Sequence, residues 1–170
     1  MSAIDDLVAT AQSRAAAIAG GHLPRVPARG VVVLTCMDAR IDPAALFGLA
    51  PGDAHVLRTA GGVVGAGELR SLAVSQRLLG TTEIAVILHT DCGMRTFTDA
   101  EFRDELEAET GVRPDWPETV FGDVEDDVRA TVRRILDDSF IPHKKSVRGF
   151  VYDVDTGRLD EVDPGRREMS

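Results

Sequence analysis

Two cysteines and one histidine have the residue types and the spacing of a metal site. Cys36 ends the apolar run VVVLTC (31–36), His89 ends the run EIAVILH (83–89), and Cys92 follows His89 by three residues. Two thiolates and an imidazole form a borderline-soft ligand set that suits zinc. Three protein ligands leave one tetrahedral position open, as a catalytic site requires, and the sequence has no third cysteine to close it. These residues therefore predict a catalytic zinc site.

The segment CMDAR (36–40) places two charged side chains beside Cys36. Where a strand runs into a turn, Asp38 is close enough to Cys36 to face the open position of the metal. Arg40 is close enough to pair with Asp38, and a planar, permanently charged guanidinium keeps a carboxylate ionised and oriented. We therefore expect Asp38 to accept a hydrogen bond from the catalytic water and Arg40 to hold Asp38 in place.

Each of these residues also has an ordinary structural interpretation. A lone cytosolic cysteine is usually a small buried apolar residue, and a histidine at a strand end can be a satisfied core residue. Asp38 and Arg40 could form only a structural ion pair. The combination of strand-end ligands, the His-x-x-Cys spacing and the adjacent Asp-x-Arg favours function over these alternatives.

Buried strands must position the ligands. The runs 31–36, 54–59 and 83–89 are apolar and rich in β-branched residues, a pattern typical of strands in a parallel sheet. Ligands of such sheets bind outside the carboxyl ends of the strands, where the strand order reverses. If strand 54–59 flanks strand 31–36 on one side and strand 83–89 on the other, Cys36 and His89 meet at that point.

Helices alternate with these strands. The sequence predicts helices at 3–19, after Asp42-Pro43, at 68–79, at 99–109 and at 123–137, a glycine-rich loop at 60–67, and a terminal hairpin of 147–153 and 158–162. Such alternation predicts an α/β fold. We expect residues 1–170 to form a single domain with three α/β/α layers, a mainly parallel four-stranded sheet and an antiparallel edge strand.

The net charge of −9 over 170 residues argues against nucleic acid or an anionic membrane as the main partner. No stretch approaches the ~20 apolar residues that a membrane span requires. The first residues, MSAIDDLVAT, are acidic where a signal peptide would be basic, so we expect a cytoplasmic protein. In that compartment two cysteines are expected to be reduced and available to a metal.

The pattern Cys-x-Asp-x-Arg followed by His-x-x-Cys resembles the signature of the β-class carbonic anhydrases. RTAGG (58–62) resembles a further segment of that family, and the similarity continues through 69–80 and 148–157, most closely to short actinobacterial members. Where many members have two glycines after the second cysteine, this chain has Gly93-Met94. Met94 is therefore expected to narrow or shield the pocket.

The resemblance implies a zinc lyase, a carbonate dehydratase that hydrates carbon dioxide reversibly to bicarbonate and a proton. It implies one zinc per chain on Cys36, His89 and Cys92, with Asp38 and Arg40 as catalytic residues. Asp38 would ligate the zinc only in a closed, inactive state. It also implies a homodimer or tetramer, in which the N-terminal helix within 1–22 would dock on a partner subunit.

Other functions remain open at this point. The same zinc site could hydrolyse carbonyl sulfide or carbon disulfide, activities found within this superfamily. The chain could also be a non-catalytic zinc-binding module, which would bind metal without turnover. A thiol redox protein is the third alternative, but Cys36 and Cys92 form no Cys-x-x-Cys motif.

Overall fold

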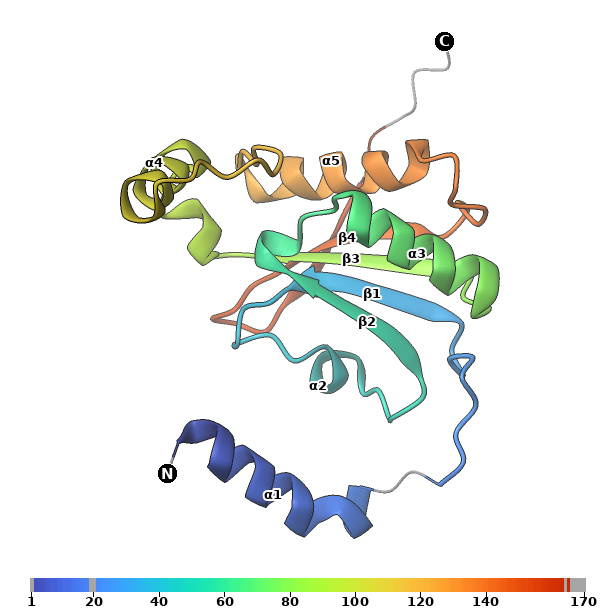
Figure 1. The fold of residues 1–170 in the computed structure, drawn as a ribbon. Coiled ribbons are helices and arrows are strands. Elements are labelled where there is room, and N and C mark those ends of the chain that lie inside the picture. The colour runs from blue at the N-terminus through green and yellow to red at the C-terminus, as the bar shows by residue number, and fades with distance from the viewer. Residues whose placement is uncertain (1, 19–20, 164, 166–170) are drawn as a thin grey trace.

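A five-stranded sheet forms the centre of the fold (Figure 1), seen in a computed structural model that describes residues 2–18, 21–163 and 165. The strands are β1 (Val31–Cys36), β2 (Ala54–Thr59), β3 (Glu83–His89), β4 (Val147–Tyr152) and β5 (Leu159–Val162). They lie in the order β2-β1-β3-β4-β5, with the first four parallel and β5 antiparallel to β4. The predicted sheet is confirmed, and β1, β2 and β3 have the predicted bounds.

The strand order reverses at β1, which lies between β2 and β3. In the register of the sheet Thr35 is paired with Ile87, and Cys36 is paired with Thr59. The carboxyl ends of β1 and β3 therefore lie side by side at the same end of the sheet. This is the switch point at which open α/β sheets bind ligands, and it is where Cys36 and His89 lie.

Helices cover both faces of the sheet, which gives the three predicted layers. The helices are α1 (Ala3–Ile18), α2 (Pro43–Phe47), α3 (Ala66–Leu78), α4 (Asp99–Thr110) and α5 (Val124–Asp137), with short 3-10 turns η1 (Ala60–Gly62) and η2 (Gly93–Arg95). Helices α3 and α5 lie over one face of the sheet and α2 lies on the other (Figure 1). Among the described residues, no helix has the length and apolar character needed to cross a membrane.

Local capping explains where several helices begin. Thr98 accepts a hydrogen bond from the Glu101 backbone N–H at 3.2 Å, and the Glu101 carboxylate accepts one from the Thr98 backbone N–H at 2.9 Å. This is the predicted capping box of α4. Helix α3 begins two residues earlier than predicted, because the Glu68 carboxylate accepts the Gly65 backbone N–H at 2.8 Å and caps the helix at Gly65. Residues 66–67 of the predicted loop are thus helical.

The main core lies between the sheet and α5. Val128, Val132 and Ile135 of α5 are fully buried against strand residues such as Val86. Gly149 of β4 allows this close approach, because a Cβ there would lie 2.3 Å from Val128 Cγ1. A second, smaller cluster holds Cys36, Ile41 and Cys92 and belongs to the site described below.

Helix α1 stands apart from the rest of the chain (Figure 1). Its side chains from Ala3 to Ala17 are all exposed, including those of Ile4 and Leu7, which are 70% and 69% exposed. The helix was predicted at 3–19 and is present at Ala3–Ile18, while residue 19 lies outside the described residues. Most of the stability of a helix in a protein comes from packing of its apolar face, and within the described part of the chain that face of α1 is exposed.

Candidate metal centre

The three predicted metal ligands come together at the carboxyl end of the sheet. Cys36 ends β1, His89 ends β3, and Cys92 lies in the loop that follows β3. Their ligand atoms all lie within 4.8 Å of one another, and the two sulfur atoms are 4.0 Å apart. All three side chains are buried. The sulfur separation is far longer than the ~2.05 Å of a disulfide bond, so both thiols are free to bind a metal.

The imidazole of His89 is oriented for metal binding. Its Nδ1 lies 2.8 Å from the carbonyl oxygen of Thr90, and because a carbonyl only accepts, Nδ1 carries the proton. The lone pair is then on Nε2, a buried atom that has no hydrogen-bond partner among the described residues. Burial lowers the pKa of His89, which favours the neutral form that ligates metals. A backbone-anchored imidazole with a free inner nitrogen fits a zinc ligand.

Burial has the opposite effect on the pKa of Cys92. It raises the pKa of the Cys92 thiol, and the nearby Cys36 raises it further. Two thiolates a few ångströms apart would repel each other in this buried position. A bound cation removes that penalty, so the donor set fits a divalent metal such as zinc.

Asp38 and Arg40 form the predicted pair beside these ligands. The Arg40 Nε donates to Asp38 Oδ1 at 3.0 Å, Nη2 donates to Oδ2 at 2.8 Å, and the Arg40 backbone N–H donates to Oδ1 at 2.9 Å. These hydrogen bonds hold the pKa of Asp38 well below its usual range. Asp38 Oδ2 also lies 3.9 Å from His89 Nε2. The ionised form of Asp38 is therefore favoured, and its carboxylate is held on Arg40 at the border of the ligand cluster.

Asp91 is a second anchor of Arg40 that sequence reasoning missed. Arg40 Nη1 donates to Asp91 Oδ2 at 2.6 Å, and Nη2 donates to the Asp91 carbonyl oxygen at 2.7 Å. Asp91 has a positive φ of 50°, which turns the chain between His89 and Cys92. The sequence signal that could have identified Asp91 is its position between His89 and Cys92, which brings its carboxylate close to the residues beside the metal site.

Arg58 is the second functional residue that sequence reasoning did not assign. Its Nε donates to the Cys36 carbonyl oxygen at 3.0 Å, and its Nη2 donates to the Asp38 carbonyl oxygen at 2.6 Å. Arg58 is paired with Thr35 in the sheet register, so it stands beside the turn that follows β1. It ties β2 to the backbone that presents both the ligand and the carboxylate. The sequence signal that could have identified Arg58 is its position near the end of the predicted strand 54–59, next to the strand that ends at Cys36.

A cavity of about 590 Å³ borders this site. Its wall includes the residues that follow the two cysteines, the glycine-rich turn η1, and aromatic side chains of the region around α4. The lining residues are Met37, Thr59, Ala60, Val63, Gly65, Glu68, Met94, Phe97, Asp99, Phe102, Trp116, Thr119 and Phe121. Met94 also packs against the cluster of Cys36, Ile41 and Cys92, so it contacts both the cavity and that cluster.

The chain is similar to known carbonic anhydrases over nearly its whole length. The sequence model of the carbonic anhydrase family matches residues 31–159. Beta-carbonic anhydrase 1 of Mycobacterium tuberculosis is 46% identical over 164 residues, which is 96% of this chain and 100% of that protein. The crystal structure of a carbonic anhydrase from Streptococcus mutans superposes with a TM-score of 0.89 at 42% identity, covering 96% of this chain and 99% of that one. A shorter match links the chain to a carbon disulfide hydrolase of an Acidianus species, with 47% identity over 73 residues, 43% of this chain and 36% of that protein.

Proposed function

Because the chain belongs to the β-carbonic anhydrase family of enzymes, we propose that it binds one zinc ion and hydrates carbon dioxide reversibly to bicarbonate and a proton. Cys36, His89 and Cys92 would hold the metal. The observation that carries this proposal is the buried cluster of their ligand atoms, all within 4.8 Å of one another, beside a carboxylate held by an arginine. A reducing compartment such as the cytoplasm would keep both thiols available.

Zinc bound in this cluster would lower the pKa of a water molecule enough for it to act as a nucleophile near neutral pH. The residues of the chain supply orientation. Asp38 has both carboxylate oxygens on Arg40 and one of them 3.9 Å from His89 Nε2, so it can accept a hydrogen bond from a water beside the ligands. Because Arg40 keeps Asp38 ionised, Asp38 accepts this hydrogen bond and does not compete as a proton donor.

Arg40 also has a second role in this proposal. A carboxylate next to a zinc ion with an open position can ligate that ion, which would close the site and inactivate the enzyme. Arg40 opposes this by binding both Asp38 oxygens, and Asp91 in turn holds the far side of the guanidinium. We propose that the arrangement seen here is the open state and that Asp38 becomes a metal ligand only when it leaves Arg40.

A second candidate reaction is the hydrolysis of carbon disulfide or carbonyl sulfide at the same site. The match to the Acidianus carbon disulfide hydrolase favours it. That match covers 43% of the chain, whereas the similarity to the mycobacterial carbonic anhydrase covers 96%. Carbon dioxide hydration is therefore the first proposal. A zinc-binding module without turnover is the remaining alternative.

One combined experiment separates these functions. Elemental analysis of the purified chain should find one zinc per chain, and stopped-flow measurements should find rapid carbon dioxide hydration. Release of hydrogen sulfide from carbonyl sulfide and carbon disulfide should be slower. Faster sulfide release than hydration would select the second candidate, and bound zinc without any turnover would select the non-catalytic module.

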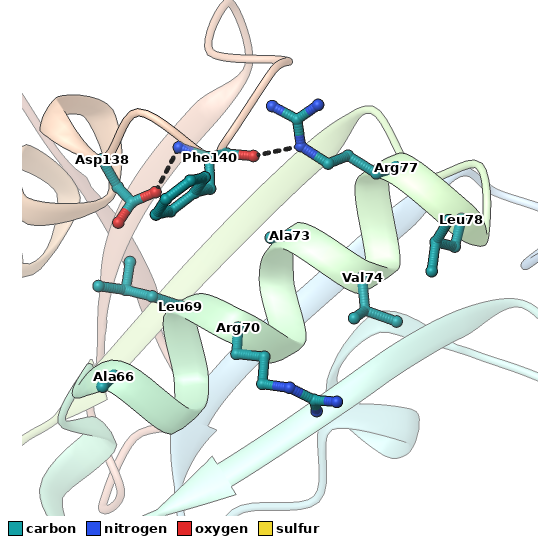
Figure 2. Close-up of a pocket in the computed structure, with 9 residues that line it drawn as sticks. All are labelled: Ala66, Leu69, Arg70, Ala73, Val74, Arg77, Leu78, Asp138 and Phe140. Carbon is teal, nitrogen blue, oxygen red and sulfur yellow. Dashed lines mark hydrogen bonds between the residues drawn. The ribbon is translucent and has the colours of Figure 1, made fainter.

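We also propose that the chain forms a homodimer or a tetramer, with α1 docking on a partner subunit. Helix α3 and the segment after α5 that holds Asp138 and Phe140 form a groove of about 560 Å³. Its apolar floor includes Leu69 and Ala73. Figure 2 shows the guanidinium groups of Arg70 and Arg77 at the border of this groove. The first turn of α1 carries Asp5 and Asp6 and its exposed side chains include Ile4 and Leu7, so its charge and its apolar surface both complement the groove.

This dimer has its own test. Figure 1 shows α1 and α3 on opposite sides of the sheet, so α1 of one chain would reach the groove of another. Sedimentation velocity should find a wild-type dimer that dissociates in Leu7→Asp and in Ala73→Arg. Val112→Asp is the control, because Val112 is 68% exposed, much like Leu7. A Leu7→Asp protein that sediments like the wild type would contradict docking through α1.

A further inference from the structure

Cys92 is the one predicted zinc ligand that lies outside the sheet. Cys36 and His89 end β1 and β3, so the pairing of those strands with their neighbours fixes their backbone. Cys92 lies in the loop after β3 and directly precedes the short turn η2. None of the three residues of η2 is buried, so core packing does little to fix this turn. The position of Cys92 therefore depends on what the loop binds on either side.

Arg95 is connected to Cys92 through the single turn η2. The Arg95 backbone N–H donates to the Cys92 carbonyl oxygen at 3.0 Å, which closes the turn. Thr96 reinforces the turn, because its backbone N–H and its hydroxyl donate to the Gly93 carbonyl oxygen at 3.2 Å and 2.8 Å. A contact that holds Arg95 in place therefore also restrains the backbone of Cys92.

The Arg95 side chain binds this turn to the start of α5. Its Nη1 donates to the Gly122 carbonyl oxygen, and its Nη2 donates to Asp127 Oδ2 at 2.5 Å. Both Asp127 carboxylate oxygens also accept the Gly122 backbone N–H at 3.2 Å, so the three residues form a closed set of hydrogen bonds. A planar guanidinium bound through two nitrogens to two partners has little freedom to turn. We call these three residues the η2 clamp.

The far end of the η2 clamp is fixed to the main core. Asp127 is in the first turn of α5, and Val128, the next residue, is fully buried in the core cluster. Asp91 fixes the other side of the loop through its two hydrogen bonds with Arg40. Cys92 thus lies in a loop that is held by an arginine on each side.

From this geometry we infer that Arg95 is a positioning residue for Cys92, and that the η2 clamp holds this ligand in place for zinc. A ligand that is already held in position loses less conformational freedom when a metal binds. The metal then binds more tightly and leaves more slowly. The inference rests on the zinc binding of the proposed function and gives Arg95 no contact with the substrate.

The first test measures zinc retention in two variants. Arg95→Leu keeps an apolar side chain and removes both side-chain hydrogen bonds, whereas Asp127→Asn keeps the size of the side chain and removes its charge. Chelator competition should find zinc binding roughly tenfold weaker in Arg95→Leu, the low end of the effect of losing a residue behind the ligands, with correspondingly faster release of zinc. Asp127→Asn should change both in the same direction by a smaller factor.

The double variant should lose no more zinc affinity than Arg95→Leu alone, because the two residues act through one contact. Wild-type zinc affinity and release rate in Arg95→Leu overturn the inference. If Arg95→Leu does not fold, Asp127→Asn decides the question in the same way, since wild-type zinc retention in that variant also overturns it.

Arg103→Leu is the matched control. Arg103 binds the Asp99 carboxylate at 2.7 Å and donates to the Trp116 carbonyl oxygen, so its partners are of the same kinds as those of Arg95. The two ion pairs are similarly enclosed, with side chains 15% and 14% exposed for the control and 23% and 19% exposed for the clamp. Neither partner of Arg103 belongs to the loop that carries Cys92. Both variants should lower Tm, but only Arg95→Leu should lose zinc affinity. Equal losses of zinc affinity would show a general loss of stability and overturn the positioning role.

Cobalt absorption gives a readout that does not depend on catalysis. The visible bands of Co²⁺ bound in place of zinc respond to the geometry of its ligands. Arg95→Leu should therefore shift or weaken these bands, whereas Arg103→Leu should keep the wild-type spectrum. Arg95→Lys, which can bind one of the two partners, should be intermediate. Identical spectra for wild type and Arg95→Leu overturn the inference. A wild type that binds zinc without hydrating carbon dioxide would instead refute the proposed function, while affinities and spectra still test the clamp; a wild type that binds no metal would overturn both.

Discussion

Gly62→Ala is expected both to lower the stability of the protein and to weaken zinc binding. Gly62 ends η1, has a positive φ of 69°, and is buried. A Cβ at this position would lie 2.4 Å from Leu88 Cδ2 and 3.5 Å from the Cys36 backbone nitrogen. Leu88 is only 4% exposed and directly precedes His89, so its side chain would have to shift within the core, next to a metal ligand.

The magnitude follows from two contributions. Holding a residue with a Cβ in the left-handed region costs about 1–2 kcal/mol. Overpacking a well-packed core costs about 1–3 kcal/mol. The free energy of unfolding should therefore fall by about 2–5 kcal/mol. For a chain of this size each kcal/mol lowers Tm by about 2–4 °C, so the expected decrease is roughly 4–20 °C.

Thermal denaturation at one fixed protein and zinc concentration is the assay, because binding of metal or of a second copy would itself shift Tm. Zinc affinity, measured by chelator competition, should decrease in the same variant. Gly67→Ala is the matched control: nothing lies within 4 Å of its added Cβ, and it stands inside α3. There alanine should stabilise by up to about 1 kcal/mol. A Gly62→Ala protein with wild-type Tm and zinc affinity would refute the reasoning.

Three further predictions concern the ligands and the charged pair. Cys92→Ala should lower zinc affinity by more than roughly 100-fold, since loss of a residue that only hydrogen-bonds to a ligand already costs about 10–100-fold in metal affinity. Full zinc occupancy of this variant by elemental analysis would rule out this ligand set. Arg40→Ala should keep its zinc and lose about 100-fold in kcat/KM with a Tm change within about 4 °C, whereas Arg129→Ala, which removes another exposed arginine with two carboxylate partners, should keep its activity. Zinc affinity should fall as the pH is lowered, because burial raises the pKa of Cys92 and its thiol must lose a proton to bind the metal; an affinity independent of pH in competition titrations would contradict this.

Much of the fold and the ligand set could be predicted because the decisive patterns are local. The run VVVLTC is short, β-branched and mostly apolar at consecutive positions, which is typical of a strand covered on both faces, and β1 has those bounds. Thr98 and Glu101 define the start of α4 by their own mutual hydrogen bonds. Cys36 and His89 were placed at strand ends and predicted to meet if strand 31–36 lay between the other two strands, and the structure has that order.

The surroundings of the ligands depended on tertiary structure. Arg58 reaches the carbonyl groups of Cys36 and Asp38 only because β2 lies directly beside β1. Asp91 reaches Arg40 across 51 positions in the sequence, and Phe121 reaches Gly61 across a longer separation. The chain specifies locally where each strand ends and which atoms can bind a metal. Which side chains fill the space around those atoms depends on strand order and loop path, which arise only when distant segments pack together.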